Sequence, residues 1–206
     1  MTSLLELDRL VFNQKAKLIE LTNEYHIRDE NGSDVGFVRE EGQSKLKKLA
    51  RFLSEVDKLL THRLMVYETD GERVLELTRP RKVFKSRLLV ANGSGQAIGE
   101  IVQKNVFGKI RFDLNDASGR TVGQIRAENW RAWDFAIVDA TENDVARITK
   151  KWGGLAKAVF TTADNYVVEI DPAVNGDLRL LVVASAAGID TALKQDDRGL
   201  SVDDFV

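Results

Sequence analysis

The chain has no cysteine, which excludes disulfide bonds, thiol catalysis and thiolate metal sites. Histidine is almost as scarce. His26 and His62 are the only two in 206 residues, and neither has the spacing of a metal site or a catalytic triad. Two prolines and no low-complexity linker argue against a string of domains. We therefore expect a single non-enzymatic domain without a metal or other cofactor, in a reducing, cytoplasmic compartment.

Long apolar runs are also missing. The most apolar stretch is the uncharged run Leu180–Ile189, about half the 20 residues that a membrane-spanning helix needs. Five consecutive small residues within it, Ala184 to Gly188, permit close approach of neighbouring elements. A helix that is apolar on all sides belongs in a protein core. This pattern predicts a buried helix from Leu178 to Leu193.

The net charge is −2, so the molecule as a whole has no attraction to nucleic acid, and we expect no nucleic-acid partner. Attraction to any anionic surface must then come from a local patch. The last residues, 195–206, carry five charges and few apolar anchors, which is typical of a disordered acidic tail. We expect residues 1–194 to form the folded domain.

A repeat is present in the first three quarters of the chain. Five segments share an apolar strand, a polar turn and a second strand: YHIRDENGSDVGFV, LMVYETDGERVLEL, LLVANGSGQAIGEI, FDLNDASGRTVGQI and FAIVDATENDVARI. The first apolar residues after these turns are 39, 24, 24 and 23 positions apart. Two strands with a short turn and a connection fit 24 residues. The Asn-Gly and Asp-Gly pairs in the turns favour hairpins because they tolerate positive φ.

The wider first spacing is explained by an insertion. Residues 44–60, SKLKKLARFLSEVDKLL, place apolar side chains at helical intervals with Lys and Arg between them. We expect an amphipathic helix there, packed outside the sheet or closing one end of a barrel. A position on a membrane surface is the alternative.

The hairpins, two earlier strand candidates (LVFNQK and KLIEL) and YVVEI near residue 168 make about a dozen strands. So many short antiparallel strands favour a closed barrel or a sandwich. Eight strands already leave an interior just wide enough for side chains, so twelve need a filling. The expected fold is therefore mainly β: a 12-stranded closed antiparallel barrel around a central hydrophobic C-terminal helix.

The C-terminal part carries a specific motif. A strand ends in Ile-x-Lys-x-Trp-x-Gly, an aromatic Phe-Thr-x-Ala-Asp-Asn turn follows, and an apolar helix ends in Ile-Asp. The thirteen matching positions are Ile148, Lys150, Trp152, Gly154, Phe160, Thr161, Ala163, Asp164, Asn165, Tyr166, Pro172, Ile189 and Asp190. This segment closely resembles phospholipid scramblases, with LURP-one-related proteins and the Tubby C-terminal domain as more distant relatives. The resemblance implies the same barrel and a lipid function, scrambling or phosphoinositide binding.

Two family features are missing. Scramblases have an acidic, calcium-binding segment at the aromatic turn, but Thr162 and Ala173 stand here at positions of expected ligands. Calcium needs six to eight oxygens, several of them carboxylate, so Asp164 and Asn165 do not suffice. We expect this calcium site to be degenerate. The cysteine cluster that carries lipid in the family is also absent.

One basic patch, RPRKVFKSR from residue 79 to 87, holds five basic residues and no acid. In an extended strand, Arg79, Arg81, Lys85 and Arg87 would share one face. We predict that these four bind phospholipid headgroups. A solvated barrel exterior is the alternative. The expected function is that of a scramblase-like protein, peripheral on the inner membrane face, with an anionic phospholipid or phosphoinositide membrane as partner. The rival is a soluble Tubby-like module that binds a protein.

Overall fold

The computed structural model describes residues 3–13, 24–41, 61–80, 86–104, 111–129, 134–150 and 165–197. Twelve strands and one long helix make up this part of the chain, together with a short 3-10 helix near its start. In chain order they are η1 (Leu4–Glu6), β1 (Arg9–Asn13), β2 (Glu24–Arg28), β3 (Asp34–Glu41), β4 (His62–Glu68), β5 (Arg73–Arg79), β6 (Arg87–Asn92), β7 (Ala97–Gln103), β8 (Arg111–Asp116), β9 (Thr121–Asn129), β10 (Asp134–Asp139), β11 (Asp144–Thr149), β12 (Asn165–Ile170) and α2 (Gly176–Asp197).

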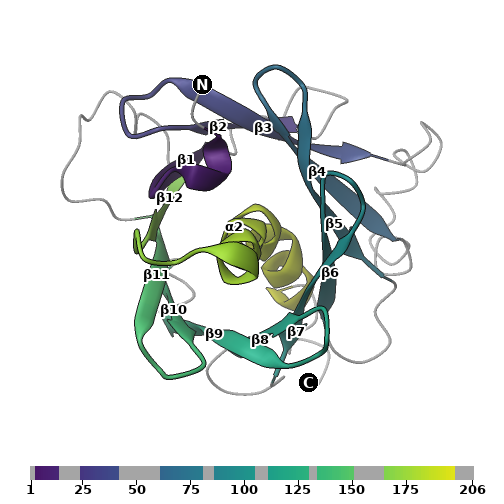
Figure 1. Cartoon of the computed structure of the whole chain (residues 1–206), viewed down its shortest axis with the longest axis vertical. Helices are drawn as coiled ribbons and strands as arrows, with labels where there is room; N and C mark the ends of the chain where they lie inside the picture. The colour runs from purple at the N-terminus through teal and green to yellow at the C-terminus, as the bar shows by residue number, and fades with distance from the viewer. Residues whose placement is uncertain are drawn as a thin grey trace, which may run out of the picture.

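The twelve strands close into one barrel, in which every neighbouring pair is antiparallel. Strands β2 to β12 follow one another around the wall. The short strand β1 closes the ring, because it pairs with β2 on one side and β12 on the other. Figure 1 looks through this ring. The predicted 12-stranded antiparallel barrel is confirmed.

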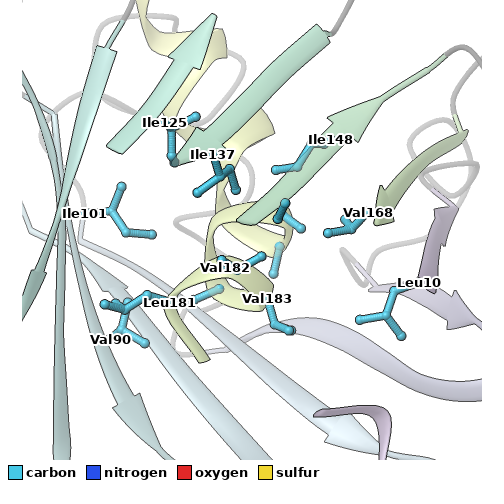
Figure 2. Close-up of a cluster of buried hydrophobic side chains, with 14 of the residues drawn as sticks. Leu10, Val90, Ile101, Ile125, Ile137, Ile148, Val168, Leu181, Val182 and Val183 are labelled. Atoms are coloured by element: carbon cyan, nitrogen blue, oxygen red, sulfur yellow. The ribbon is translucent and has the colours of Figure 1, made fainter. Parts of the chain in front are cut away.

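Helix α2 lies inside the barrel, as Figure 1 shows. Its residues Leu181, Val182 and Val183 are fully buried. Burial of each such side chain stabilises the fold by about 1.5–3 kcal/mol. Figure 2 shows these helix residues among apolar side chains from around the wall, namely Leu10, Val90, Ile101, Ile125, Ile137, Ile148 and Val168. The predicted central helix is confirmed, and it extends beyond the predicted bounds at both ends.

The small residues of α2 let the helix approach the wall closely. Ala184, Ala186 and Ala187 are at most 1% exposed. A Cβ on Gly188 would lie 2.4 Å from the Leu88 side chain of β6, so even an alanine there would force a shift. A tightly filled interior makes each of these positions sensitive to volume.

Polar contacts fix the helix along its axis. Near its start, the Arg179 guanidinium donates to Leu5 O (2.6 Å), Val174 O (3.1 Å) and Asp8 Oδ1 (2.9 Å). Nearer its other end, the hydroxyls of Tyr25 and Tyr166 donate to backbone carbonyls of the helix. These bonds tie α2 to the N-terminal segment and to β2 and β12.

The five hairpin turns share one construction. In the β8–β9 turn, Asp116 Oδ1 accepts hydrogen bonds from the backbone N–H groups of Ser118 (2.9 Å) and Arg120 (3.0 Å). Gly119 supplies the residue with positive φ, at 82°. The equivalent φ angles are 85° at Gly32, 89° at Gly71, 86° at Gly95 and 70° at Glu142. The predicted hairpins are therefore confirmed over the whole repeat.

Their turn chemistry differs from the expectation at Asn92-Gly93. The residue with positive φ is Gly95. Gly93 is instead required by close packing against the neighbouring hairpin. A Cβ at Gly93 would lie 1.7 Å from Arg73 O of the neighbouring hairpin, so only glycine fits there. Gly95 N–H donates to Asn92 O, so residues 92–95 form a β-turn whose last residue is left-handed, and not a two-residue Asn-Gly turn.

Several expectations fall outside the described residues. These are the inserted helix at 44–60 and the strand candidate at 17–21. The boundary of the C-terminal tail needs a correction, because α2 continues through Asp197 and includes the first three residues assigned to the tail. The rest of the tail lies outside the described residues.

The burial of α2 yields a stability prediction. Leu181→Ala should lower the free energy of unfolding by about 2–5 kcal/mol, because it leaves a cavity in a filled interior. The matched control is Leu89→Ala on the outer wall, where the side chain is 38% exposed; it should change stability by less than about 1 kcal/mol. Urea denaturation followed by circular dichroism measures both. Similar losses in the two variants would contradict a filled barrel.

The β8–β9 turn yields a pH prediction. The Ser118 hydroxyl and the Arg120 backbone N–H hold the pKa of Asp116 at about 2, below its ordinary 3.8. Since the folded pKa is lower than the unfolded one, the carboxylate stabilises the fold above pH 4, and this contribution is lost as pH falls from about 4 to about 2. Asp116→Asn keeps an Oδ1 acceptor, as Asn92 does naturally in the β6–β7 turn, but cannot titrate.

The stability difference between the parent chain and Asp116→Asn should therefore shrink as the pH is lowered through this window, in urea denaturation at pH 2 to 5. A carbon-13 NMR titration should place the carboxyl midpoint near pH 2. A midpoint near the ordinary value, or a constant difference between the two proteins, would contradict the hydrogen-bonded turn.

Candidate functional site

The two ends of the barrel differ in construction. At one end lie the five hairpin turns, the N-terminal segment and the start of α2. We call this the turn end. At the opposite end β1, β3, β5, β7, β9 and β11 finish, and the longer connections depart from it. We call this the loop end. The predicted headgroup-binding segment, residues 79–87, joins β5 to β6 at the loop end.

The structure separates the two described residues of the predicted basic stripe. Arg79 ends β5 and is only 7% exposed, on the same inward face as Leu75 and Leu77. Arg87 begins β6 with 56% of its side chain exposed. The prediction that both share one outward face is wrong for Arg79. The physical reason is that β5 and β6 are separate strands, so the alternation of one does not continue into the other. Arg81 and Lys85 lie outside the described residues.

Arg79 instead belongs to a polar group inside the barrel. It stands directly opposite His62 in the β4–β5 pairing. His62 Nδ1 lies 2.6 Å from Glu40 Oε1, and both side chains are less than 10% exposed. Buried charges are costly unless they have partners. We therefore assign the contact between His62 and Glu40 to the stability of the fold. From its spacing in the sequence, His62 was excluded only from a metal site or a catalytic triad. The alternation of β3, β4 and β5 would have placed all three residues inward.

The same polar interior continues onto β6 and β7. Ser86, just before β6, and Gln103, at the end of β7, are buried. Gln103 accepts a hydrogen bond from the Ser86 backbone N–H at 3.3 Å. At the loop end, the inner face of the barrel is therefore polar along β3 to β7. Along β12 and β1 the inner face is aromatic, and the ring centroids of Tyr166 and Phe12 stack 5.2 Å apart.

A second set of basic residues at the loop end points outward. Its described members are Arg63 on β4, Arg87 on β6, Lys104 just after β7 and Arg111 on β8, all exposed. We call these four the basic arc. Arg87 forms an ion pair with Glu100, and Lys104 lies 3.4 Å from Asp113 Oδ1. Exposed pairs of this kind contribute about 0–1 kcal/mol, which leaves the cations able to exchange partners. Only Arg87 of this group was singled out from the sequence.

The motif residues of the C-terminal part divide between described and undescribed positions. Lys150 follows β11 and is half-buried, and Asn165 begins β12 and is 3% exposed. Asp190 lies within α2. Trp152, Gly154, Phe160 and Asp164 fall outside the described residues. The motif therefore brackets the connection from β11 to β12 at the loop end.

The described part of the aromatic turn does not fit a calcium site. Asn165 is buried, and Ala173 has no side-chain oxygen. Ala173 also lies beyond the other end of β12, at the turn end, where its backbone N–H donates to Asp171 Oδ1 at 2.8 Å. Within the described ranges there is no group of three or more His, Asp or Glu residues placed to hold a metal ion.

The fold and site together define a closed antiparallel barrel with a helix through its centre and a basic arc at one end. The sequence profile of the Scramblase family matches residues 1–193. The chain belongs to the Scramblase family. No curated protein and no solved structure gives a significant match. In the described part of the chain, no helix has both the length and the apolarity needed to span a membrane.

The separation of the two arginines yields a prediction. Arg79→Ala should lower the free energy of unfolding by about 1–3 kcal/mol, because it removes a buried guanidinium and leaves the polar side chains around it with fewer partners. Arg87→Ala should change it by less than about 1 kcal/mol, since an exposed ion pair contributes little. Urea denaturation compares these variants, which have the same charge change. A larger loss for Arg87→Ala would contradict the inward placement of Arg79.

Proposed function

We propose that this Scramblase-family protein associates with membranes by binding anionic phospholipid headgroups at the loop end, in a role that is not enzymatic. The observation that carries the proposal is the basic arc: Arg63, Arg87, Lys104 and Arg111 are exposed at one end of a family barrel. Arg81 and Lys85 belong to the same proposed site by sequence. Arg79 does not, because its side chain is buried.

The charge of the whole molecule makes a local site necessary. The net charge is −2, so an anionic surface repels the protein at a distance. Each Lys or Arg close to such a surface contributes about 1 kcal/mol of attraction, within a Debye length of about 8 Å. Four such residues on neighbouring parts of one rim are sufficient for weak, reversible binding. We place this contact at the cytoplasmic face of the membrane.

No step of the proposal uses calcium. The described residues of the family's calcium segment do not fit the ion, and headgroup binding by arginine and lysine needs no bridging metal. Vesicle binding should therefore persist in EDTA, and millimolar calcium should not strengthen it; calcium should weaken it only by screening the anionic headgroups.

Vesicle sedimentation tests the proposal. Vesicles with phosphatidylserine or a phosphoinositide should bind the protein, and binding should weaken as salt rises. Replacing Lys85 and Arg87 by Ala should lower the partition coefficient by about 30-fold, which corresponds to two contributions of about 1 kcal/mol. The matched control replaces Arg28 and Arg120 at the turn end, which removes the same charge and should have little effect.

Absence of binding at low salt would overturn the lipid proposal and favour the module that binds a protein. Equal losses in the two double variants would overturn the assignment to the loop end. Phosphatidylcholine vesicles serve as the neutral control, and thermal melting confirms that each variant is folded.

A further inference from the structure

A row of basic residues crosses the outer wall of the barrel from β8 to β11, which lie side by side in Figure 1. Arg111 on β8 stands directly opposite Arg126 on β9, and Arg126 stands opposite Ala136 on β10. On its other side Ala136 pairs with Arg147 on β11. The row points outward, because the residues that alternate with it are buried in the core: Phe112, Ile125, Phe135 and Ile148. Three guanidinium groups therefore share one level of the wall.

The direct pairing of Arg111 with Arg126 is unfavourable by itself. Residues opposite each other on neighbouring antiparallel strands have Cβ atoms about 4.5–5.5 Å apart, and like charges there destabilise the sheet. Arg147 differs, because it forms a bidentate ion pair with Asp134, in which both N···O distances are 2.8 Å. An anion that reaches both Arg111 and Arg126 would offset their repulsion.

The Glu142 carboxylate takes this position in the structure. Arg126 Nη2 donates to Glu142 Oε1 at 2.5 Å, and the Glu142 side chain is 71% exposed. The hydrogen bond and charge of Arg126, with a smaller contribution from the charge of Arg111, hold the pKa of Glu142 below its ordinary value. An internal carboxylate thus lies in the field of both arginines.

Glu142 reaches Arg126 from a strained backbone position. Its φ is 70°, and it closes the β10–β11 turn in the left-handed conformation. The equivalent residue is glycine in each of the other four turns, at positions 32, 71, 95 and 119. A residue other than glycine in this region is strained, and such residues cluster at functional sites. Glycine would suit the turn better, but it could not place a carboxylate on Arg126.

We infer that Arg111 and Arg126 form a binding site for a phosphate group on the outer wall, and that the Glu142 carboxylate occupies this site until phosphate displaces it. Arginine binds phosphate oxygens through paired N–H donors. A phosphate monoester carries about −1.5 to −2 charges near pH 7, more than the single charge of a carboxylate. The small side chain of Ala136 leaves room beside Arg126 for the ligand.

This site is separate from the proposed headgroup contact. Arg126 and Glu142 do not belong to the basic arc, and the inference does not require that the protein binds membranes. Arg111 belongs to both groups, so the variants that test the site leave it unchanged. A soluble phosphate compound and a lipid headgroup present the same oxygens, and the experiment distinguishes these two sources.

Titration with inorganic phosphate, followed by the NMR signals of the arginine Nε–H groups, tests the site. Glu142→Gln should tighten phosphate binding by about 10-fold, because it removes a negative charge roughly 5 Å from the ligand. Glu142→Gly should give the same gain and fold normally, since glycine serves the other four turns. The matched control is Glu30→Gln, which frees Arg9 from an ion pair of the same kind. It should show no gain, because Glu169 stands opposite Arg9.

A second substitution at Arg126 separates a site from a general charge effect. In the Glu142→Gln background, Arg126→Ala should cancel the gain in phosphate affinity. Arg126→Lys should restore only part of it, because lysine keeps the charge but lacks the paired donors of arginine. Thermal melting confirms that each variant is folded.

The outcomes decide the inference. Absence of a gain for Glu142→Gln, a gain that survives Arg126→Ala, or an equal gain for Glu30→Gln would overturn it. Vesicles containing phosphatidic acid then identify the source of the phosphate. Stronger vesicle binding by Glu142→Gln than by Glu30→Gln assigns the site to a lipid headgroup, and equal vesicle binding assigns it to a soluble phosphate compound. Failure of the loop-end contact with membranes leaves the titration with inorganic phosphate unaffected, so the two proposals fail separately.

Discussion

The filling of the barrel is the constraint on which the rest of the structure depends. A ring of twelve strands is too wide to be filled by its own side chains. Helix α2 therefore supplies the missing core, and its small residues set how closely the wall can approach. Because the helix follows β12 and enters at the turn end, its far half reaches the loop end. The helix thus runs through the barrel from the turn end to the loop end.

The repeat of hairpins has a consequence for function. All five tight turns have a left-handed residue near their end, and four of them begin with an Asp or Asn whose side chain accepts backbone N–H groups within the turn. In the β4–β5 turn the acceptor is Asp70, two residues after the first position. This construction favours Asp and Asn in the turns. By sequence, the segments that join strands at the loop end (14–23, 42–61, 80–86, 104–110, 130–133 and 150–164) contain more Lys and Arg than Asp and Glu.

Predictions from the sequence succeeded where the signal was local and periodic. The apolar run of α2 and the five turns were identified because each depends on residues close together in the chain. The basic stripe failed at Arg79 because side-chain direction was extrapolated across the connection between two strands. The group of Glu40, His62 and Arg79 was missed for a related reason: its members come from three strands and meet only across the sheet.

By itself the sequence determined the strands, the turns and the helix that fills them, since hydrophobic alternation and turn chemistry act over a few residues. The closure by β1, which pairs Phe12 with Tyr166 on β12 and with Ile27 on β2, was decided only by the tertiary structure. So was the inward position of Arg79. In a closed antiparallel barrel, alternate connections lie at opposite ends, and a charge's position along the chain does not show which end it will occupy until the strand order and register are known.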